Sequence, residues 1–195
     1  AGYLSAPCPP PTCDQAVKVK TSDPRILVHI LPGIKQTDPA DVMRGEETQI
    51  AGYLNNTPDY NGLICLPGTH SKWVSVENTK VAEFQTFMTG EIYDLLSRNS
   101  VLKHSVSSNG FSHSDFVEAA KSAFTNTADV SSQLFRLRAQ HLVHDTDPDV
   151  LRARLSGILI GQEIAAMKDS WRSLPITLIG EDALCALYKT ALGAV

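Results

Sequence analysis

A short apolar run and two short segments of alternating apolar and polar residues constrain the fold more than any other feature of the sequence. They cover residues 62–66, 73–77 and 81–88, and only a few residues separate each from the next. A period of two is typical of β-strands, and connections this short join strands that run antiparallel. The sequence therefore predicts a sheet that begins as consecutive hairpins.

After the third segment, the spacing of the apolar residues becomes that of helices. Thr89 and either Ser112 or Ser114 are the expected N-caps of the first two helices. Gly157 and Gly161 lie one turn apart, which indicates close packing against another helix. The expected elements are helices over residues 89–98, 112–124, 130–144 and 147–171, a buried strand over 175–180, and a last helix over 181–192.

The part of the chain before the hairpins has weaker patterns. Its proline-rich opening, up to Asp23, predicts a loop. A strand is expected over residues 25–31, and a helix over 41–53 with Asp38 or Asp41 as its N-cap.

The composition indicates a globular protein with a sizeable core, since 43% of the 195 residues are hydrophobic. A net charge of -4 gives no overall basic field, so we expect neither nucleic acid nor an anionic membrane as partner. The longest apolar stretch, residues 158–167, is interrupted by Gln162 and Glu163 and is shorter than the roughly 20 residues that span a bilayer.

The cysteines, at positions 8, 13, 65 and 185, are too scattered for a disulfide framework. Reduced thiols and a cytoplasmic location are therefore expected. Cys8 and Cys13 flank three prolines, and a bridge or metal site there is the alternative to a plain loop.

Strand, strand, strand, helices, strand, helix is the order of one lobe of the ribonuclease-H-like, actin-like ATPase architecture, an α/β fold with antiparallel hairpins, inserted helices and a final strand-helix unit. Five motifs follow in order: "DVMRGEETQ" (Asp41–Gln49), "CLPGTHSKWV" (Cys65–Val74), "MTGE" (Met88–Glu91), "SGILIGQE" (Ser156–Glu163) and "ITLIGEDALCALY" (Ile176–Tyr188). Together they resemble the 2-dehydro-3-deoxygalactonokinase family, within the superfamily of sugar kinases, actin and heat-shock chaperones.

The resemblance implies a carbohydrate kinase of galactonate breakdown. Its cofactors would be ATP and Mg²⁺, and it would transfer the γ-phosphate to the 6-hydroxyl of 2-dehydro-3-deoxy-D-galactonate. It also implies two lobes: residues 1–54 would be the end of the first lobe and the inter-lobe segment, and residues 55–195 the second, nucleotide-binding lobe.

The superfamily's first phosphate loop, an Asp-x-Gly-x-Thr segment that organises Mg²⁺, is not in the sequence. We therefore expect a second lobe, incomplete at its C-terminal end, with a remnant of the first. An incomplete sheet leaves an exposed edge, which favours a homo-oligomer. A truncated, non-catalytic nucleotide-binding or interaction module is the alternative function, and ATP hydrolysis without an acceptor is a third.

The turn between the first two strands is the expected phosphate site. Gly68 lets backbone approach an anion closely, and outward-pointing amides at a hairpin turn form an anion-binding concavity. Thr69, His70 and Ser71 would line it, and Lys72 would add a positive charge. The resemblance makes this turn the second phosphate-binding loop, which holds the β- and γ-phosphates. A solvated turn is the alternative.

The expected catalytic residues lie before this turn. Phosphoryl transfer to an alcohol needs a carboxylate that positions the hydroxyl and accepts its proton. Related kinases have a catalytic aspartate in a Gly-Asp-Gln segment here, and Gly45-Glu46-Glu47 resembles it, which implies Glu46 as base with Glu47 as substitute. Neighbours on a helix point about 100° apart, so only one should face substrate. Arg44 would bind the substrate carboxylate.

The remaining candidates begin helices. Gly180 and Glu181 follow the last strand, where the resemblance places the adenosine motif, and Thr89 and Glu91 would face substrate or the phosphate tail. No metal site is expected: the histidines and aspartates of residues 141–147 lack the helical spacing of metal ligands.

Overall fold

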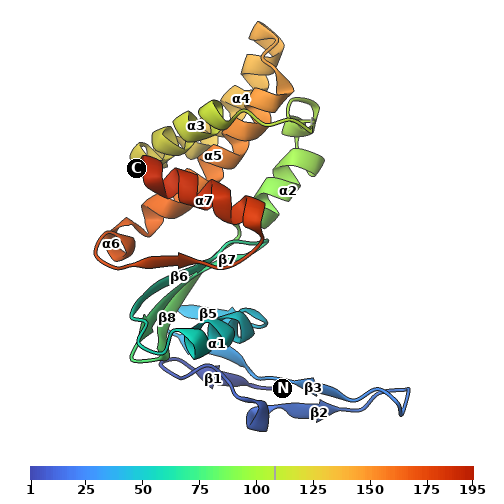
Figure 1. The fold of residues 1–195 in the computed structure, drawn as a ribbon. Coiled ribbons are helices and arrows are strands. Elements are labelled where there is room, and N and C mark those ends of the chain that lie inside the picture. Colours follow the sequence, from blue (N-terminus) through green and yellow to red (C-terminus); the bar gives the residue numbers. More distant parts are fainter. Residues whose placement is uncertain (108) are drawn as a thin grey trace. The chain divides into compact units, whose positions relative to one another are not determined.

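The structure, a computed structural model, describes every residue of the chain except residue 108 and is of mixed α/β class (Figure 1). Its contacts divide the chain into two compact units. Unit 1 consists of Ala1–Leu66, Lys72–Thr86 and Leu174–Ile179, and unit 2 of Pro67–Ser71, Phe87–Ser173 and Gly180–Val195.

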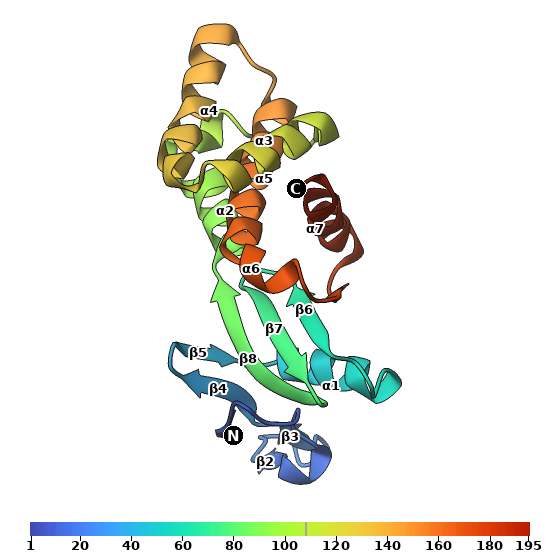
Figure 2. The same ribbon diagram turned by 90° about the vertical axis from the view of Figure 1, so that its left-hand side faces the viewer.

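The predicted hairpins form a four-stranded sheet with the strand order β8-β7-β6-β9. Its strands are β6 (Gly62–Leu66), β7 (Ser71–Glu77), β8 (Lys80–Phe87) and β9 (Ile176–Leu178). β6 pairs antiparallel with β7 and parallel with β9. β7 and β8 run in opposite directions (Figure 2), and the two residues that join them, Asn78 and Thr79, both have positive φ, as tight hairpins require.

The sheet carries the core of unit 1. All five residues of β6 are buried, which explains why this strand is apolar without interruption. Ile64 and Val74 lie opposite each other in the register and pack with Ile34, Met43 and Ile50. β9 covers only Ile176–Leu178, so the predicted strand over residues 175–180 was too long. It is half-buried along its length, so the prediction that this strand is buried was also wrong.

The prediction of a loop up to Asp23 was wrong. This segment contains β1 (Tyr3–Ser5), a short 3-10 helix η1 (Cys13–Gln15) and β2 (Val17–Val19). β1 pairs in parallel with β4 (Gly33–Thr37), and β2 pairs with β3 (Val28–Ile30), which is shorter than the predicted strand over residues 25–31. Three-residue strands are too short for a pattern of alternation, and the partner of β1 lies far along the chain.

The predicted helix over residues 41–53 begins later than expected. Residues 40–43 form strand β5 (Ala40–Met43), antiparallel to β4, and helix α1 spans Glu46–Asn56. Asp41 caps no helix: its carboxylate accepts hydrogen bonds from the backbone amide and the hydroxyl of Thr86, both at 2.7 Å. The N-cap is Gly45, whose φ of 115° is a conformation that favours glycine.

The helices of unit 2 follow the predictions closely. They are α2 (Thr89–Asn99), η2 (Val101–His104), α3 (His113–Thr125), η3 (Thr127–Asp129), α4 (Val130–His144), α5 (Pro148–Ala166), α6 (Lys168–Trp171) and α7 (Asp182–Ala194). The expected long helix is interrupted at Met167, and Asp147 caps it by accepting a hydrogen bond from the amide of Asp149. No helix within the described part of the chain is long and apolar enough to cross a membrane.

The four cysteines all lie in the described part of the chain and are free thiols. Cys8 is buried and Cys13 exposed, so they form no bridge with each other. Cys8 instead pairs through its backbone with Val81, at amide-to-carbonyl distances of 3.1 and 2.9 Å.

α5 packs closely against α3 at the two glycines that the sequence singled out. A Cβ atom at Gly157 would lie 2.4 Å from the carbonyl oxygen of Phe116, and one at Gly161 would lie 2.3 Å from that of Ala120. No side chain fits between the two backbones, which confirms that these glycines serve helix packing.

We expect Gly161→Ala to lower the free energy of unfolding by about 1–3 kcal/mol, because the methyl group must push α3 and α5 apart. Gly193→Ala is the matched control in the same unit, since no atom lies within 4 Å of its Cβ position. The control should be neutral or stabilising, by at most about 1 kcal/mol. Urea unfolding of both variants is the measurement, and equal stabilities would contradict the packing role.

Candidate functional site

The turn between β6 and β7 rests on the first turn of α2, within unit 2. A Cβ atom at Gly90 would lie 2.3 Å from the carbonyl oxygen of Gly68 and 2.8 Å from Cα of Thr69. The amide of Glu91 donates to the carbonyl oxygen of Thr69 at 2.9 Å. The two backbones are thus in direct contact, which only glycine at position 90 allows.

The backbone amides of this turn are available to a ligand. Within the described part of the chain, the N–H groups of Gly68, Thr69 and His70 donate to no acceptor. Consecutive free N–H groups at a turn favour an anion.

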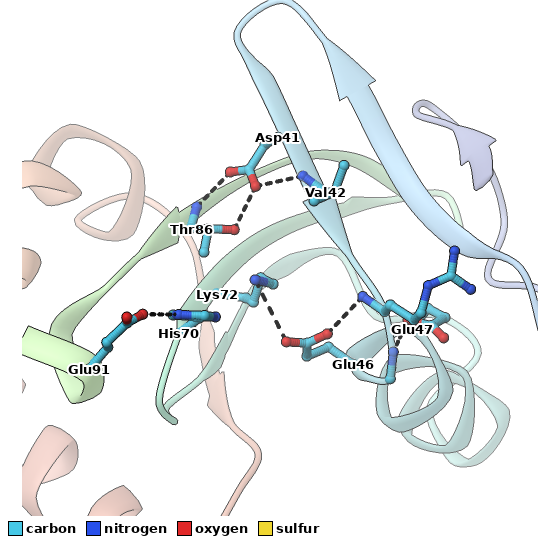
Figure 3. Close-up of polar contacts among 10 residues, drawn as sticks. Asp41, Val42, Glu46, Glu47, His70, Lys72, Thr86 and Glu91 are labelled. Carbon is cyan, nitrogen blue, oxygen red and sulfur yellow. Dashed lines mark hydrogen bonds and ion pairs between the residues drawn. The ribbon is translucent and has the colours of Figure 1, made fainter. Parts of the chain in front are cut away.

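The turn also brings together two side chains that the sequence assigned separately, to phosphate and to substrate. Nε2 of His70 lies 2.5 Å from a carboxylate oxygen of Glu91 (Figure 3). Both side chains are partly exposed, so the pair lies at the surface of unit 2. The contact orients the imidazole ring and leaves Nδ1 as the ring nitrogen that can meet a ligand.

A buried group of polar side chains lies behind the turn, and the sequence analysis missed its centre. Glu163, on α5, is 2% exposed and accepts hydrogen bonds from the hydroxyls of Thr89 and Tyr188. Tyr188, on α7, is also bonded to the hydroxyl of Ser71, at 2.9 Å. The signal in the sequence was the single acid within the apolar stretch of α5.

Thr89 does not have the predicted role of helix cap. The N-cap of α2 is Met88, and Thr89 is the first residue of the helix. Its hydroxyl points to Glu163 instead of a backbone amide of its own helix.

Unit 2 contains a cavity of about 730 Å³ beside the turn. Gly68, Thr69 and Arg152 line it, and much of the wall is apolar, including Leu184 and Leu187. The lining also includes the charged residues Glu91 and Asp94, so the cavity combines a mainly apolar surface with polar groups, as sites for small molecules do.

Gly180 and Glu181 lie at the start of α7. A Cβ atom at Gly180 would lie 3.2 Å from the carbonyl oxygen of Pro67, so this position is close to the beginning of the turn. Glu181 is the N-cap of α7, and its carboxylate accepts from the amide of Leu184 at 2.9 Å. This bond gives Glu181 a structural function that the sequence analysis did not predict.

Unit 1 carries the expected catalytic carboxylates on the first turn of α1. Oε1 of Glu46 lies 3.6 Å from Nζ of Lys72, and Oε2 accepts from the amide of Arg44 at 3.1 Å (Figure 3). The side chain of Glu46 is 25% exposed and that of Lys72 only 5%. Lys72 therefore points its charge at Glu46, while one side of the carboxylate remains accessible.

Glu47 has a different environment from its neighbour. It is 2% exposed, and its carboxylate accepts from the amide of Gly45 at 2.6 Å. Burial raises the pKa of Glu47, and the hydrogen bond from Gly45 opposes this only in part. Glu46 is accessible and Glu47 is buried because neighbours on a helix point about 100° apart.

Arg44 is exposed, but its guanidinium group is held by residues at the start of the chain. Its guanidinium lies 4.4 Å from the ring centre of Tyr3 and donates to the carbonyl oxygens of Ala1 and Gly2, at 3.3 and 3.2 Å. These bonds fix the side chain against the N-terminal strand.

No group of three or more histidine, cysteine, aspartate or glutamate side chains that could hold a metal ion occurs among the described residues.

Comparison with known proteins gives a consistent result. The model of the family described as 2-keto-3-deoxy-galactonokinase matches residues 1–195. The chain is 42% identical over 176 residues to a "Probable 2-dehydro-3-deoxygalactonokinase" of Rhizobium meliloti (strain 1021), covering 85% of this chain and 56% of the relative. It is 33% identical to the 2-dehydro-3-deoxygalactonokinase of Escherichia coli (strain K12), covering 100% of this chain and 65% of the relative.

A solved structure is also similar. The crystal structure of a Sinorhizobium meliloti protein, with a provisional 2-dehydro-3-deoxygalactonokinase assignment, matches with a TM-score of 0.91 and 38% identity. The match covers 100% of this chain and 64% of that one. The chain thus spans less than two thirds of the length of each of these relatives.

The burial of Glu47 predicts a pH dependence of stability. The folded pKa lies above the ordinary 4.5, so as the pH rises the unfolded chain loses this proton first, and Glu47 increasingly destabilises the fold until the pH passes the folded pKa. We therefore expect the stability of Glu47→Gln relative to the wild type to increase with pH over this window and then to level off.

Urea unfolding of both proteins from about pH 4 to about pH 8 measures the effect. The matched control is Glu83→Gln, on the exposed side of β8, which should show a nearly constant difference from the wild type. A Glu47→Gln difference that is flat or falls with pH would contradict the raised pKa.

Proposed function

Because the chain belongs to the 2-keto-3-deoxy-galactonokinase family, we propose that it takes part in phosphoryl transfer from ATP to the 6-hydroxyl of 2-dehydro-3-deoxy-D-galactonate. The observation that carries the proposal is the turn of residues 68–70, with three unbonded backbone amides held against α2. ATP would supply the phosphoryl group, and these amides would bind its phosphates.

The finer architecture is part of the proposal. We infer that the four-stranded sheet belongs to a ribonuclease-H-like lobe of the actin-like kind, with residues 55–195 as the nucleotide-binding lobe and residues 1–54 as the end of the first. The strand order β8-β7-β6-β9 supports this inference, since three consecutive antiparallel strands are followed by one parallel to the first of them.

Unit 2 would bind the nucleotide. The cavity beside the turn has apolar walls at Leu184 and Leu187 that suit a purine ring, and Thr69, whose amide is unbonded, also lines it. The start of α7, with Gly180 and Glu181, borders the same turn and would lie near the adenosine.

Unit 1 would supply the general base. Glu46 is the accessible member of the acidic pair, and Lys72 together with the amide of Arg44 holds its carboxylate in one orientation. A carboxylate fixed in this way can position a hydroxyl group and accept its proton as the bond to phosphorus forms. Lys72 would act mainly through Glu46, and Arg44 would meet the carboxylate of the substrate with the donors that remain free.

The proposal predicts release of ADP from MgATP by this chain only when 2-dehydro-3-deoxygalactonate is present. A coupled assay for ADP, with and without the acceptor, is the measurement, and nucleotide binding is measured in parallel by calorimetry. Binding without acceptor-dependent release would favour the alternative of a non-catalytic nucleotide-binding module. Release at the same rate without acceptor would instead indicate an ATP hydrolase.

Removing the proposed base should affect turnover far more than nucleotide binding. We expect Glu46→Gln to lower kcat by about 10²–10⁴-fold, because the amide cannot accept the proton, while the Kd for ATP stays nearly constant. Glu83→Gln is the exposed control and should retain the wild-type rate. Circular dichroism must show that Glu46→Gln is folded, since it leaves the buried Lys72 without its carboxylate. A near-normal rate in that folded variant would exclude Glu46, and loss of activity in Glu47→Gln alone would transfer the role to Glu47.

A further inference from the structure

We propose that Glu163 is a positioning residue that holds the phosphate-binding turn and the start of α2 in register, an inference that rests on the proposed function. The side chain lies on α5, is 2% exposed, and is placed behind the turn. It would act on the nucleotide only through other residues.

Hydrogen bonds link this carboxylate on α5 directly to α2 and α7, and through Tyr188 to the end of the turn. Oε2 of Glu163 accepts from the hydroxyl of Thr89, the first residue of α2, and from that of Tyr188 on α7, at 2.7 Å for the tyrosine. Tyr188 is itself 2.9 Å from Oγ of Ser71, which directly follows the turn and also belongs to unit 2. One carboxylate on α5 is therefore linked to both backbone segments of the phosphate site.

The direction of each hydrogen bond follows from the number of protons. An ionised carboxylate only accepts, so Thr89 and Tyr188 must each donate to Glu163. A tyrosine hydroxyl has a single proton, and with that proton given to Glu163 it can only accept from Ser71. The whole chain of bonds is thus directed toward Glu163.

This direction changes the roles expected for two hydroxyls. Ser71 is fully buried, and its only hydroxyl proton is directed to Tyr188; that of Thr89 is directed to Glu163. Neither can donate to a phosphate without breaking a buried hydrogen bond. The phosphate contacts would then come from the backbone amides of Gly68, Thr69 and His70, with Ser71 and Thr89 as their support.

The support matters because unbonded amides bind an anion well only when they are already in place. Flexible amides lose conformational entropy on binding, whereas fixed ones do not. The bond from the amide of Glu91 to Thr69 and the contact at Gly90 join the turn to α2, and the links from Glu163 fix both from behind. Hydrogen bonds to a charged acceptor are stronger than neutral ones, so a carboxylate suits this role better than an amide.

Exchange of the Glu91 amide proton, measured by NMR without any nucleotide, tests the proposal. This amide can exchange only when α2 separates from the turn. In Glu163→Gln, the carboxamide oxygen can still accept from both hydroxyls, but it is a neutral and therefore weaker acceptor than the carboxylate. We therefore expect exchange at Glu91 about tenfold faster. The amide of Asn126, bonded to Ser122 at the end of α3, should be unchanged and serves as the internal reference.

Two variants separate positioning from general stability. Gln162→Glu is the reverse substitution at the exposed neighbouring position and should leave hydrogen exchange at the Glu91 amide unchanged. Ile158→Val weakens the core of unit 2 on the same helix and should lower the Tm without a selective effect at Glu91. Wild-type exchange at Glu91 in a folded Glu163→Gln variant would overturn the proposal.

Tyr188→Phe provides a second test, which applies even if Glu163→Gln does not fold. It removes the link to Ser71 but retains the bond between Thr89 and Glu163, so the Glu91 amide should exchange faster than in the wild type. No change in Tyr188→Phe would also overturn the inference.

Calorimetry with ATP then connects the support to the ligand. We expect Glu163→Gln to weaken ATP binding about tenfold and Gln162→Glu not to weaken it. If the wild type binds no ATP, the proposed nucleotide site is wrong, whereas the exchange data still decide whether Glu163 positions the turn.

Discussion

The contact between Gly90 and the backbone of Gly68 and Thr69 is the constraint on which the candidate nucleotide site depends. With the carbonyl oxygen of Gly68 at 2.3 Å from the Cβ position, any side chain at residue 90 would separate α2 from the turn. The amide of Glu91 could then no longer reach Thr69, and His70 would lose the geometry of its contact with Glu91. The short motif from Met88 to Glu91 is thus best understood as the part that fixes the phosphate-binding backbone.

Buried charge occurs at the places where the proposed chemistry needs fixed geometry. Lys72 and Glu163 are 4% and 2% exposed, and both have hydrogen-bonding or charged partners. Removing one member of such a group leaves the other buried and uncompensated, which is strongly destabilising. Apolar side chains at these positions would often make the fold as stable or more stable. These buried charged groups are therefore better explained by the orientation that they give to their partners than by a gain in stability. Lys72 orients Glu46, and Glu163 orients the turn.

The sequence predicted elements whose signal is local. The hairpins of β6, β7 and β8 and the helices of unit 2 have apolar spacing that is visible within a single window, and the structure contains them at nearly the expected residues. It did not predict β1 or β5, because a strand of three or four residues is defined by a partner elsewhere in the chain. The carboxylate of Asp41 illustrates the difficulty: it resembles a helix cap locally, but it bonds to Thr86, far along the chain.

In the candidate site, too, the sequence reveals the types of the residues but not the contacts that they make. A turn rich in hydroxyls next to a strand suggests that each hydroxyl is a ligand, and the sequence alone gives no reason to treat Ser71 differently from Thr69. The difference arises from Tyr188, more than a hundred positions away, whose proton is directed to Glu163 and whose oxygen therefore accepts from Ser71. Which hydroxyl binds and which supports is decided by the direction of these protons, and that direction depends on helices α5 and α7 packing behind the turn.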